Sequence, residues 1–103
     1  MFKRKKNLPP THPGELLRDE IMPAAGLTQE RLAELLGVSR RTVHEIVTEK
    51  RSLSADMAHR IARLFDTTPD FWLGLQQDVD LWRAARAGQT AYRKIRPLRK
   101  SAA

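Results

Sequence analysis

Apolar residues recur at helical spacing in five stretches of the chain, and each stretch follows a residue that favours the start of a helix. The pattern predicts helices over about 13–22, 29–36, 40–48, 55–65 and 70–86. Glycine, proline, serine and threonine separate these stretches. The chain has no run of alternating polar and apolar residues and no internal repeat. The sequence therefore predicts an all-α domain of five helices.

Prolines mark both ends of the first predicted helix. Thr11 or His12 is expected to cap it, because Pro13 then occupies the first helical position, where its missing N–H costs no hydrogen bond. Pro23 and Gly26 are expected to end the helix before the next one begins.

The segment 28–51 has the layout of a helix-turn-helix. Counting from Gln29, a small residue stands at the fifth position, a glycine at the ninth, and β-branched residues at the fifteenth and eighteenth: Ala33, Gly37, Val43 and Ile46. The small residue permits a close helix crossing, the glycine can take the positive φ that ends a helix, and the branched residues seat the second helix on the first. Thr28 and Ser39 are the expected N-caps of these two helices, and Ser54 and Thr68 are the expected N-caps of the two helices that follow. The apolar face of the first helix is expected to comprise Leu32, Ala33, Leu35 and Leu36.

The second helix of such a motif presents its N-terminal side chains to the major groove of DNA. Arg40 and Arg41 could read guanine or hold phosphates, whereas Lys50 and Arg51 are expected to hold phosphates. Glu45 stands four residues after Arg41, which predicts an exposed ion pair. The complete set of expected DNA contacts is Gln29, Ser39, Arg40, Arg41, Thr42, His44, Lys50 and Arg51.

The fifth predicted helix is the most aromatic part of the chain. Its apolar residues form a continuous stripe that is longer than a small domain can cover, so part of it is expected to form a subunit interface. Beyond Gly88, cations separate the apolar residues and Pro97 stops any helix. Residues 95–98 are either a short extended segment against a partner subunit or part of a ragged basic tail. The expected homodimer interface comprises Trp72, Leu75, Val79, Trp82, Tyr92, Ile95 and Leu98.

The net charge of +7 comes from the two ends of the chain. Residues 1–6 contain four cations and no acid, and residues 93–103 contain five cations and no acid. The remaining 10 cations face 12 acids, so the body is slightly acidic and its basic residues gather near the second helix of the motif. We therefore expect a basic N-terminal tail (1–8), a DNA-binding domain with a dimerisation helix (9–87) and a basic C-terminal segment (88–103).

The composition offers no support for catalysis. There are no cysteines, the three histidines do not stand at metal-ligand spacing and are expected at the surface, and there is no glycine-rich phosphate loop. We expect no catalytic residue, no metal and no cofactor. No apolar run is long enough to span a bilayer and the N-terminus lacks the apolar stretch of a signal peptide, so a cytoplasmic protein is expected.

The chain resembles the HigA-type antitoxins, a branch of the Xre/Cro-like helix-turn-helix proteins. The resemblance rests on HPGELL at 12–17, VSR at 38–40, LSADMA at 53–58, and DTTPDFWL at 66–73 with LQ at 75–76 and DLW at 80–82. It implies a Cro/repressor-like fold and a homodimer that binds double-stranded operator DNA, represses its own operon and neutralises a ribosome-dependent mRNA nuclease of the HigB type. Where the family usually has Asn-Gly-Lys-Arg after the reading helix, this chain has TEKR at 48–51, which lacks the glycine and adds an acid.

Three hypotheses follow. The first is an operator-binding repressor that is also an antitoxin, and the second is a stand-alone transcription regulator on the same fold without a toxin partner. These two are separated by co-purification with the product of the adjacent small gene. The third is a basic RNA-degrading enzyme, which predicts nuclease activity in the pure protein.

Overall fold

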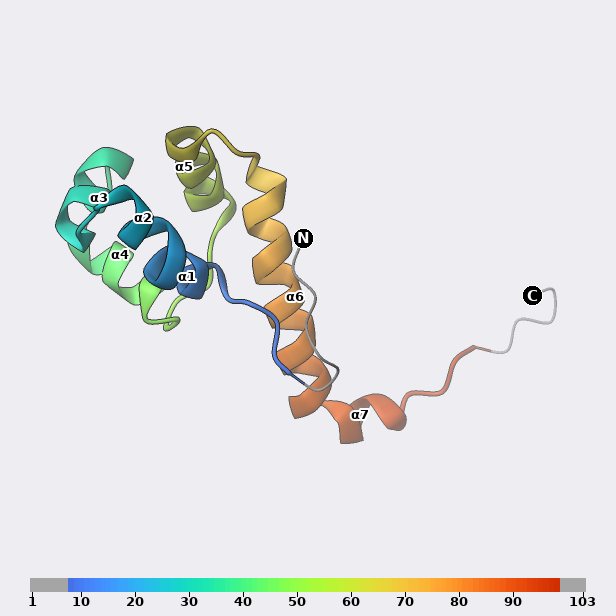
Figure 1. Ribbon diagram of the computed structural model, residues 1–103. Helices are drawn as coiled ribbons and strands as arrows, with labels where there is room; N and C mark the ends of the chain where they lie inside the picture. Colours follow the sequence, from blue (N-terminus) through green and yellow to red (C-terminus); the bar gives the residue numbers. More distant parts are fainter. Residues whose placement is uncertain (1–7, 99–103) are drawn as a thin grey trace.

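The computed structural model describes residues 8–98, and Figure 1 shows the arrangement of their helices. These elements are α1 (Pro13–Leu16), the π-helical turn η1 (Leu17–Ile21), α2 (Met22–Ala25), α3 (Gln29–Leu36), α4 (Arg40–Val47), α5 (Ala55–Phe65), α6 (Pro69–Ala87) and α7 (Gln89–Arg93). The all-α prediction is confirmed. Because α1, η1 and α2 follow one another without a break, the described chain has six helical segments instead of the five expected.

The first helical segment passes through Pro23 instead of ending there, so the prediction is wrong for Pro23, whereas the predicted end at Gly26 is confirmed. The segment continues to Ala25 and ends at Gly26, which has a φ of 66°. The backbone widens just before the proline: the Met22 N–H donates to the carbonyl of Leu17, five residues back. This π-helical turn removes the tight i−4 packing that a proline ring would otherwise disturb, so Pro23 fits within the first turn of α2.

The four longer helices begin where the sequence places their caps. The hydroxyls of Thr28, Ser39, Ser54 and Thr68 accept from the backbone N–H three residues on, at 3.0–3.2 Å. Gly37 ends α3 with a φ of 71°, which leaves room for the turn into α4. Each cap satisfies an N–H that has no partner inside its own helix.

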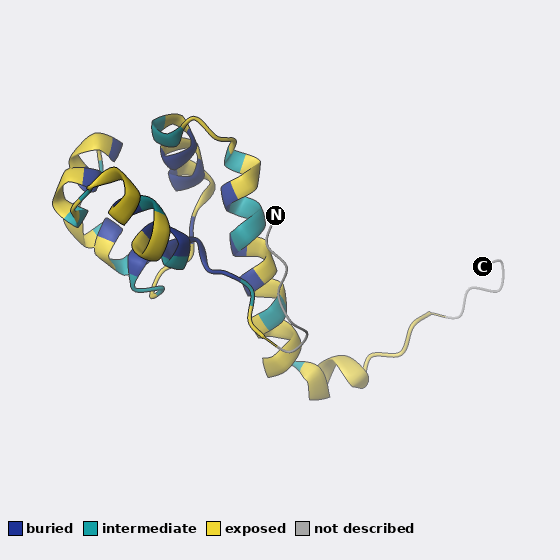
Figure 2. Cartoon of the chain, viewed as in Figure 1, coloured by how far each residue is buried: buried dark blue, intermediate teal, exposed yellow. Residues whose placement is uncertain are grey.

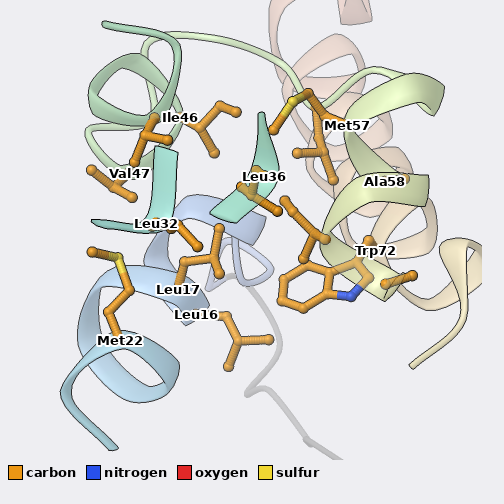
Figure 3. Close-up of a cluster of buried hydrophobic side chains, with 14 of the residues drawn as sticks. Leu16, Leu17, Met22, Leu32, Leu36, Ile46, Val47, Met57, Ala58 and Trp72 are labelled. Carbon is orange, nitrogen blue, oxygen red and sulfur yellow. The ribbon is translucent and has the colours of Figure 1, made fainter. Parts of the chain in front are cut away.

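Apolar side chains from the seven elements α1 to α6, η1 included, meet in one core, which Figure 3 shows in close-up. Trp72 on α6 is fully buried in it, and its indole N–H donates to the Thr67 hydroxyl at 2.8 Å. Leu35 was expected on the apolar face of α3 but retains 41% of its surface exposed, because it lies at the edge of that face, to one side of the buried Leu32 and Leu36.

The start of α1 is buried against α4, the second helix of the helix-turn-helix. His12 caps α1: its Nδ1 accepts from the Gly14 N–H at 2.9 Å, which settles the choice between Thr11 and His12. His12 is only 2% exposed, so the expectation of a surface histidine is wrong here. A Cβ on Gly14 would lie 1.8 Å from the carbonyl oxygen of Ile46, so only glycine lets α1 approach α4 this closely.

Helix α6 runs along the side of the bundle, and its far end and α7 extend beyond it (Figure 1). Gln76 ties α6 to the loop between α4 and α5: its Oε1 accepts from the Leu53 N–H at 2.8 Å and its Nε2 donates to Asp80 at 2.9 Å. The sequence did not predict α7. Helix α7 comes immediately after Gly88. The Tyr92 ring lies against Gly88, and the Tyr92 N–H donates to the Gly88 carbonyl at 2.9 Å, which forms the first turn of α7.

Parts of both predicted terminal segments fall outside the described residues. Residues 1–7 of the expected N-terminal tail and residues 99–103 of the expected C-terminal segment are not described. The proposed division at residues 8 and 88 therefore stays a prediction. Within residues 8–98, no helix is both long enough and apolar enough to cross a membrane.

Candidate nucleic-acid interface

The N-terminal end of α4 is held by two side chains that the sequence assigns to DNA contact. The Ser39 Oγ accepts from the Thr42 N–H at 3.0 Å, and the two hydroxyls lie 2.9 Å apart. These bonds fix the first turn of the helix. Arg40 and Arg41, which follow the cap, are both exposed.

A cluster of three charged residues lies along one edge of α4. Glu45 accepts from the Arg41 Nε at 3.1 Å and lies 3.4 Å from the Arg51 Nε. The ion pair predicted between Arg41 and Glu45 is confirmed. Because the Arg41 side chain is 86% exposed, the pair contributes only about 0.3–0.5 kcal/mol. The same carboxylate draws Arg51, from the loop after α4, towards the helix.

Two cations of the predicted set have no such partner. Among the residues that the structure describes, the Arg40 and Lys50 side chains make no ion pair and no hydrogen bond, and both residues are exposed. Their charges are therefore available to an anion from solvent without the loss of an existing contact.

The start of α3 lies beside α4. The Gln29 Oε1 is 3.2 Å from the His44 Nδ1, which joins the first residue of α3 to the outward side of α4. The first backbone N–H groups of a helix attract anions, because they have no intrahelical partner and lie at the positive end of the helix dipole. This end of α3 thus adds donors to the cations of α4.

The structure places all eight predicted residues on α4, its cap, the start of α3 and the turn after α4. Gln29 and Thr42 are partly buried, and the other six are exposed: Ser39, Arg40, Arg41, His44, Lys50 and Arg51. Thr42 and Arg51 also line one shared hollow beside the start of α5. Such a row of exposed donors on a short helix matches the width of a DNA major groove and the acceptors on its base edges. We call these eight residues the α4 face.

The α4 face is supported from below by the core. Val43, Ile46 and Val47 are 1–2% exposed, so the opposite side of α4 is fully packed. Arg60 on α5 closes the turn before α4 by donating to the carbonyls of Leu36 at 2.8 Å and of Gly37 at 3.3 Å. The orientation of α4 is thereby set by several neighbouring elements.

A contact between η1 and the turn after α4 is not predicted by the sequence. The Arg18 Nη1 donates to the Val47 carbonyl at 2.8 Å and to Glu49 Oε2 at 3.1 Å. Glu49 has a φ of 63°, the left-handed conformation that glycine adopts most easily. No local signal marks this contact, because Arg18 stands 29 and 31 residues away from its two acceptors.

The residues expected at a dimer interface differ widely in exposure. Trp72 and Val79 are 0% and 3% exposed within the single chain. They have no surface to offer a second subunit, so their assignment to the interface is wrong: the stripe on α6 first completes the core of its own chain. Leu75 packs against that core and is partly buried.

The remaining interface candidates lie near the C-terminal end of the described chain. Tyr92, Ile95 and Leu98 are 52%, 70% and 89% exposed. Leu81 on α6, which was not predicted at the interface, is 63% exposed. Trp82 is partly buried and lies under the Arg86 guanidinium, 4.8 Å from the ring centroid. Figure 2 shows that the end of α6 and the whole of α7 are predominantly exposed.

Among the described residues, the remaining titratable groups form no cluster of metal ligands. Within residues 8–98, no group of three or more His, Cys, Asp or Glu side chains lies close enough to hold a metal ion. Burial lowers the pKa of His12 below its ordinary value of 6.5, and its Nδ1 already accepts from Gly14. That histidine thus serves as a neutral helix cap.

The sequence pattern of the helix-turn-helix family matches residues 17–72. An uncharacterised HTH-type transcriptional regulator of Escherichia coli, YbaQ, is 48% identical over 73 residues; the match spans 71% of this chain and 65% of that protein, slightly less than two thirds of its length. The antitoxin HigA-1 of Vibrio cholerae is 36% identical over 95 residues, which cover 92% of this chain and 90% of that protein.

A solved structure of similar fold is the Pseudomonas aeruginosa antitoxin HigA with the higBA promoter. It superposes on this chain with a TM-score of 0.83 and 44% sequence identity, over 87% of this chain and 99% of that one.

Proposed function

Because this chain belongs to the helix-turn-helix family, in its HigA-type antitoxin branch, we propose that it binds operator DNA as a homodimer and represses its own toxin–antitoxin operon. The observation that supports this most is the α4 face, where exposed cations and hydroxyls stand on a helix packed firmly from below. Arg40 and Arg41 contact base edges or the adjacent phosphates. Lys50 and Arg51 hold phosphates, and the start of α3 with Gln29 meets a phosphate on the same backbone.

The ion pairs on α4 do not oppose this role. Glu45 holds Arg41 and Arg51 only through exposed contacts, and a phosphate or a guanine edge can replace the carboxylate at small cost. In the free protein the pairs keep both arginines close to the helix. On DNA, the arginines exchange a carboxylate for an acceptor of the duplex.

The homodimer forms through the exposed apolar residues at the end of α6 and beyond. Leu81, Tyr92, Ile95 and Leu98 make up this surface, with Leu75 and Trp82 at its edge. Exposed apolar groups that gather on one part of a small chain favour association with a second copy. A dimer sets the distance between two α4 helices, which must be about 34 Å to enter successive major grooves.

The second part of the proposed function is neutralisation of a HigB-type mRNA-cleaving toxin in the cytoplasm. The support is the likeness to the Vibrio cholerae antitoxin along nine tenths of both chains. The protein acts by binding and has no catalytic activity of its own. The alternative is a transcription regulator without a toxin partner, which is favoured by the E. coli relative named only as a regulator.

Two measurements test these roles. The first is the affinity of the pure protein for a duplex from immediately upstream of its own gene, compared with an unrelated duplex of equal length. We expect clear preference for the upstream duplex, and equal binding to both would contradict the repressor role. The second is co-expression with the adjacent small open reading frame. A stable complex, together with suppressed mRNA cleavage, supports the antitoxin role, and separate elution of the two proteins supports the stand-alone regulator.

A further inference from the structure

The turn after α4 contains an acidic residue at a place where a negative charge opposes DNA binding. Glu49 directly precedes Lys50 and Arg51, which the proposed function assigns to phosphates. Its φ of 63° also makes it an unusual choice, since glycine takes this conformation at much lower cost. An unpaired carboxylate here would repel the phosphates that its two neighbours attract.

Arg18 engages this carboxylate from a different helical element. Its Nη1 lies 3.1 Å from Glu49 Oε2 and also donates to the Val47 carbonyl at 2.8 Å, at the last residue of α4. One guanidinium therefore satisfies a carbonyl at the C-terminal end of α4 and balances the charge of the turn. A cation at this end of a helix is also favoured by the helix dipole.

We propose that Arg18 is a positioning residue for operator binding, which acts through Glu49 by fixing and neutralising the turn that presents Lys50 and Arg51. The proposal rests on the proposed function, because it assumes that this turn meets DNA phosphates. Glu49 holds the left-handed conformation, with a φ of 63°. Glycine adopts this conformation without strain, whereas here the side-chain contact with Arg18 on η1 holds Glu49 in it.

The hydrogen bonds of Arg18 argue against a direct phosphate contact. An arginine has five N–H donors, and four hydrogen bonds of Arg18 are already made: one to Val47, one to Glu49 and two to Asp19, at 2.8 Å and 3.0 Å. Asp19 binds the other edge of the guanidinium, and this contact holds the pKa of the Asp19 carboxyl below its usual range. Loss of Arg18 would therefore leave two carboxylates, Asp19 and Glu49, without their cation.

The test is a double-mutant cycle on DNA binding. Affinities for the upstream duplex are measured by fluorescence anisotropy over a range of salt concentrations for the wild type, R18A, E49Q and the double variant R18A/E49Q. We expect R18A to weaken binding about threefold to fivefold, the size typical of one partly exposed charge pair. In the E49Q background, the same R18A change should alter affinity by less than about twofold, because the charge that Arg18 balances is gone.

Two further variants separate positioning from simple folding. R18K keeps a cation beside Glu49 and should bind DNA within about twofold of the wild type. D19N removes the other partner of Arg18, away from the turn, and should also bind like the wild type. Thermal melting of every variant reports whether the fold is intact. If R18A does not fold, R18Q, which keeps most of the side chain, takes its place in the cycle.

Several results would overturn the proposal. An R18A variant that binds like the wild type would show that the contact has no role in binding. A second such result is that R18A weakens DNA binding equally in the wild-type and E49Q backgrounds and reduces the slope of log affinity against log salt concentration by about one. That result would show that Arg18 holds a phosphate itself. R40A/R41A distinguishes these failures from failure of the proposed function: if its affinity equals that of the wild type, the α4 face does not bind this DNA and both proposals fall. If R40A/R41A is weakened but the cycle shows no coupling, only the Arg18 proposal falls.

Discussion

Replacing Gly14 by alanine is expected to force α1 away from α4 and to destabilise the whole chain. The added Cβ would lie 1.8 Å from the Ile46 carbonyl oxygen, 2.7 Å from the Ile46 carbonyl carbon and 3.1 Å from the Val47 Cα. All three atoms belong to the backbone of α4, so no flexible side chain can move aside. The two helices must separate by at least about 1.2 Å before the shortest distance reaches the 3.0 Å below which real Cβ contacts essentially never fall.

The size of the effect follows from what this separation disturbs. Inserting one methyl group into a packed interior costs about 1–3 kcal/mol, and a backbone obstacle places Gly14→Ala at the upper end of that range. For a domain of this size, each 1 kcal/mol lowers the melting temperature by roughly 4–8 °C. We therefore expect a fall of about 10–20 °C. Because α1 also supports the buried side of α4, operator affinity should fall in the fraction that remains folded.

Gly74 supplies the matched control for the same chemical change. It lies inside α6, and a Cβ there would meet no atom within 4 Å. Gly74→Ala should therefore stabilise the chain by about 0.5–1 kcal/mol through the higher helix propensity of alanine. Both variants are compared with the wild type by circular dichroism at 222 nm, at one protein concentration because dimerisation affects the melting temperature. A Gly14→Ala variant that melts at or above the wild-type temperature would refute direct packing of α1 on α4.

Three further predictions concern other contacts. Gln76→Leu should lower the free energy of unfolding by about 1–3 kcal/mol in urea titrations, because it leaves the buried Leu53 N–H without an acceptor. Stability should fall as the pH drops below about 6.5, the ordinary pKa of histidine. The pKa of His12 is lowered in the folded chain, so the unfolded chain binds the proton more readily. Protonation of the His12 Nδ1 also breaks the hydrogen bond from the Gly14 N–H. Urea titrations at pH 7.5 and pH 5.0 should show this loss in the wild type. Leu81→Glu should shift the protein from dimer to monomer in sedimentation equilibrium, because it places a charge within the proposed apolar interface.

Each of these three has a control in the chain. Gln77→Leu changes an exposed neighbour of Gln76 and should leave the unfolding free energy within about 0.5 kcal/mol; an equal loss in both variants would contradict the anchoring role of Gln76. His12→Asn retains an N-cap that does not titrate, and an unchanged pH dependence in it would assign the effect to another group. Arg63→Glu, on the exposed side of α5, should leave the dimer intact. If the Leu81→Glu variant is still a dimer, the assignment of this part of α6 to the interface is wrong.

The parts of the fold that the sequence predicted are those that depend on local chemistry. A hydroxyl residue three positions before the N–H that it satisfies is visible in the sequence, and the caps of α3 to α6 were placed correctly at Thr28, Ser39, Ser54 and Thr68. The helical spacing of Val43 and Ile46 likewise placed the buried side of α4. Such signals lie within one or two turns of the residue that they concern.

The features that the sequence could not predict depend on contacts between distant segments or on small backbone adjustments. The passage of the helix through Pro23 requires a π-helical turn, which leaves no mark in the hydrophobic pattern. The burial of Trp72 in its own core, instead of at an interface, depends on how many neighbours reach α6. Arg18 and Glu49 are 31 residues apart, so their pairing is visible only once η1 and α4 are placed side by side.

The central claim is that the α4 face binds operator DNA, and the most direct test is the affinity of Arg40→Ala/Arg41→Ala for the upstream duplex. Its reference is the wild type, and Arg63→Ala removes one exposed cation from α5 as the control for charge alone. We predict a loss of about 1–3 kcal/mol for each base contact removed, which is roughly fivefold to 150-fold in affinity, and little change in Arg63→Ala. Wild-type affinity in the double variant, with its fold intact by circular dichroism, would contradict the claim.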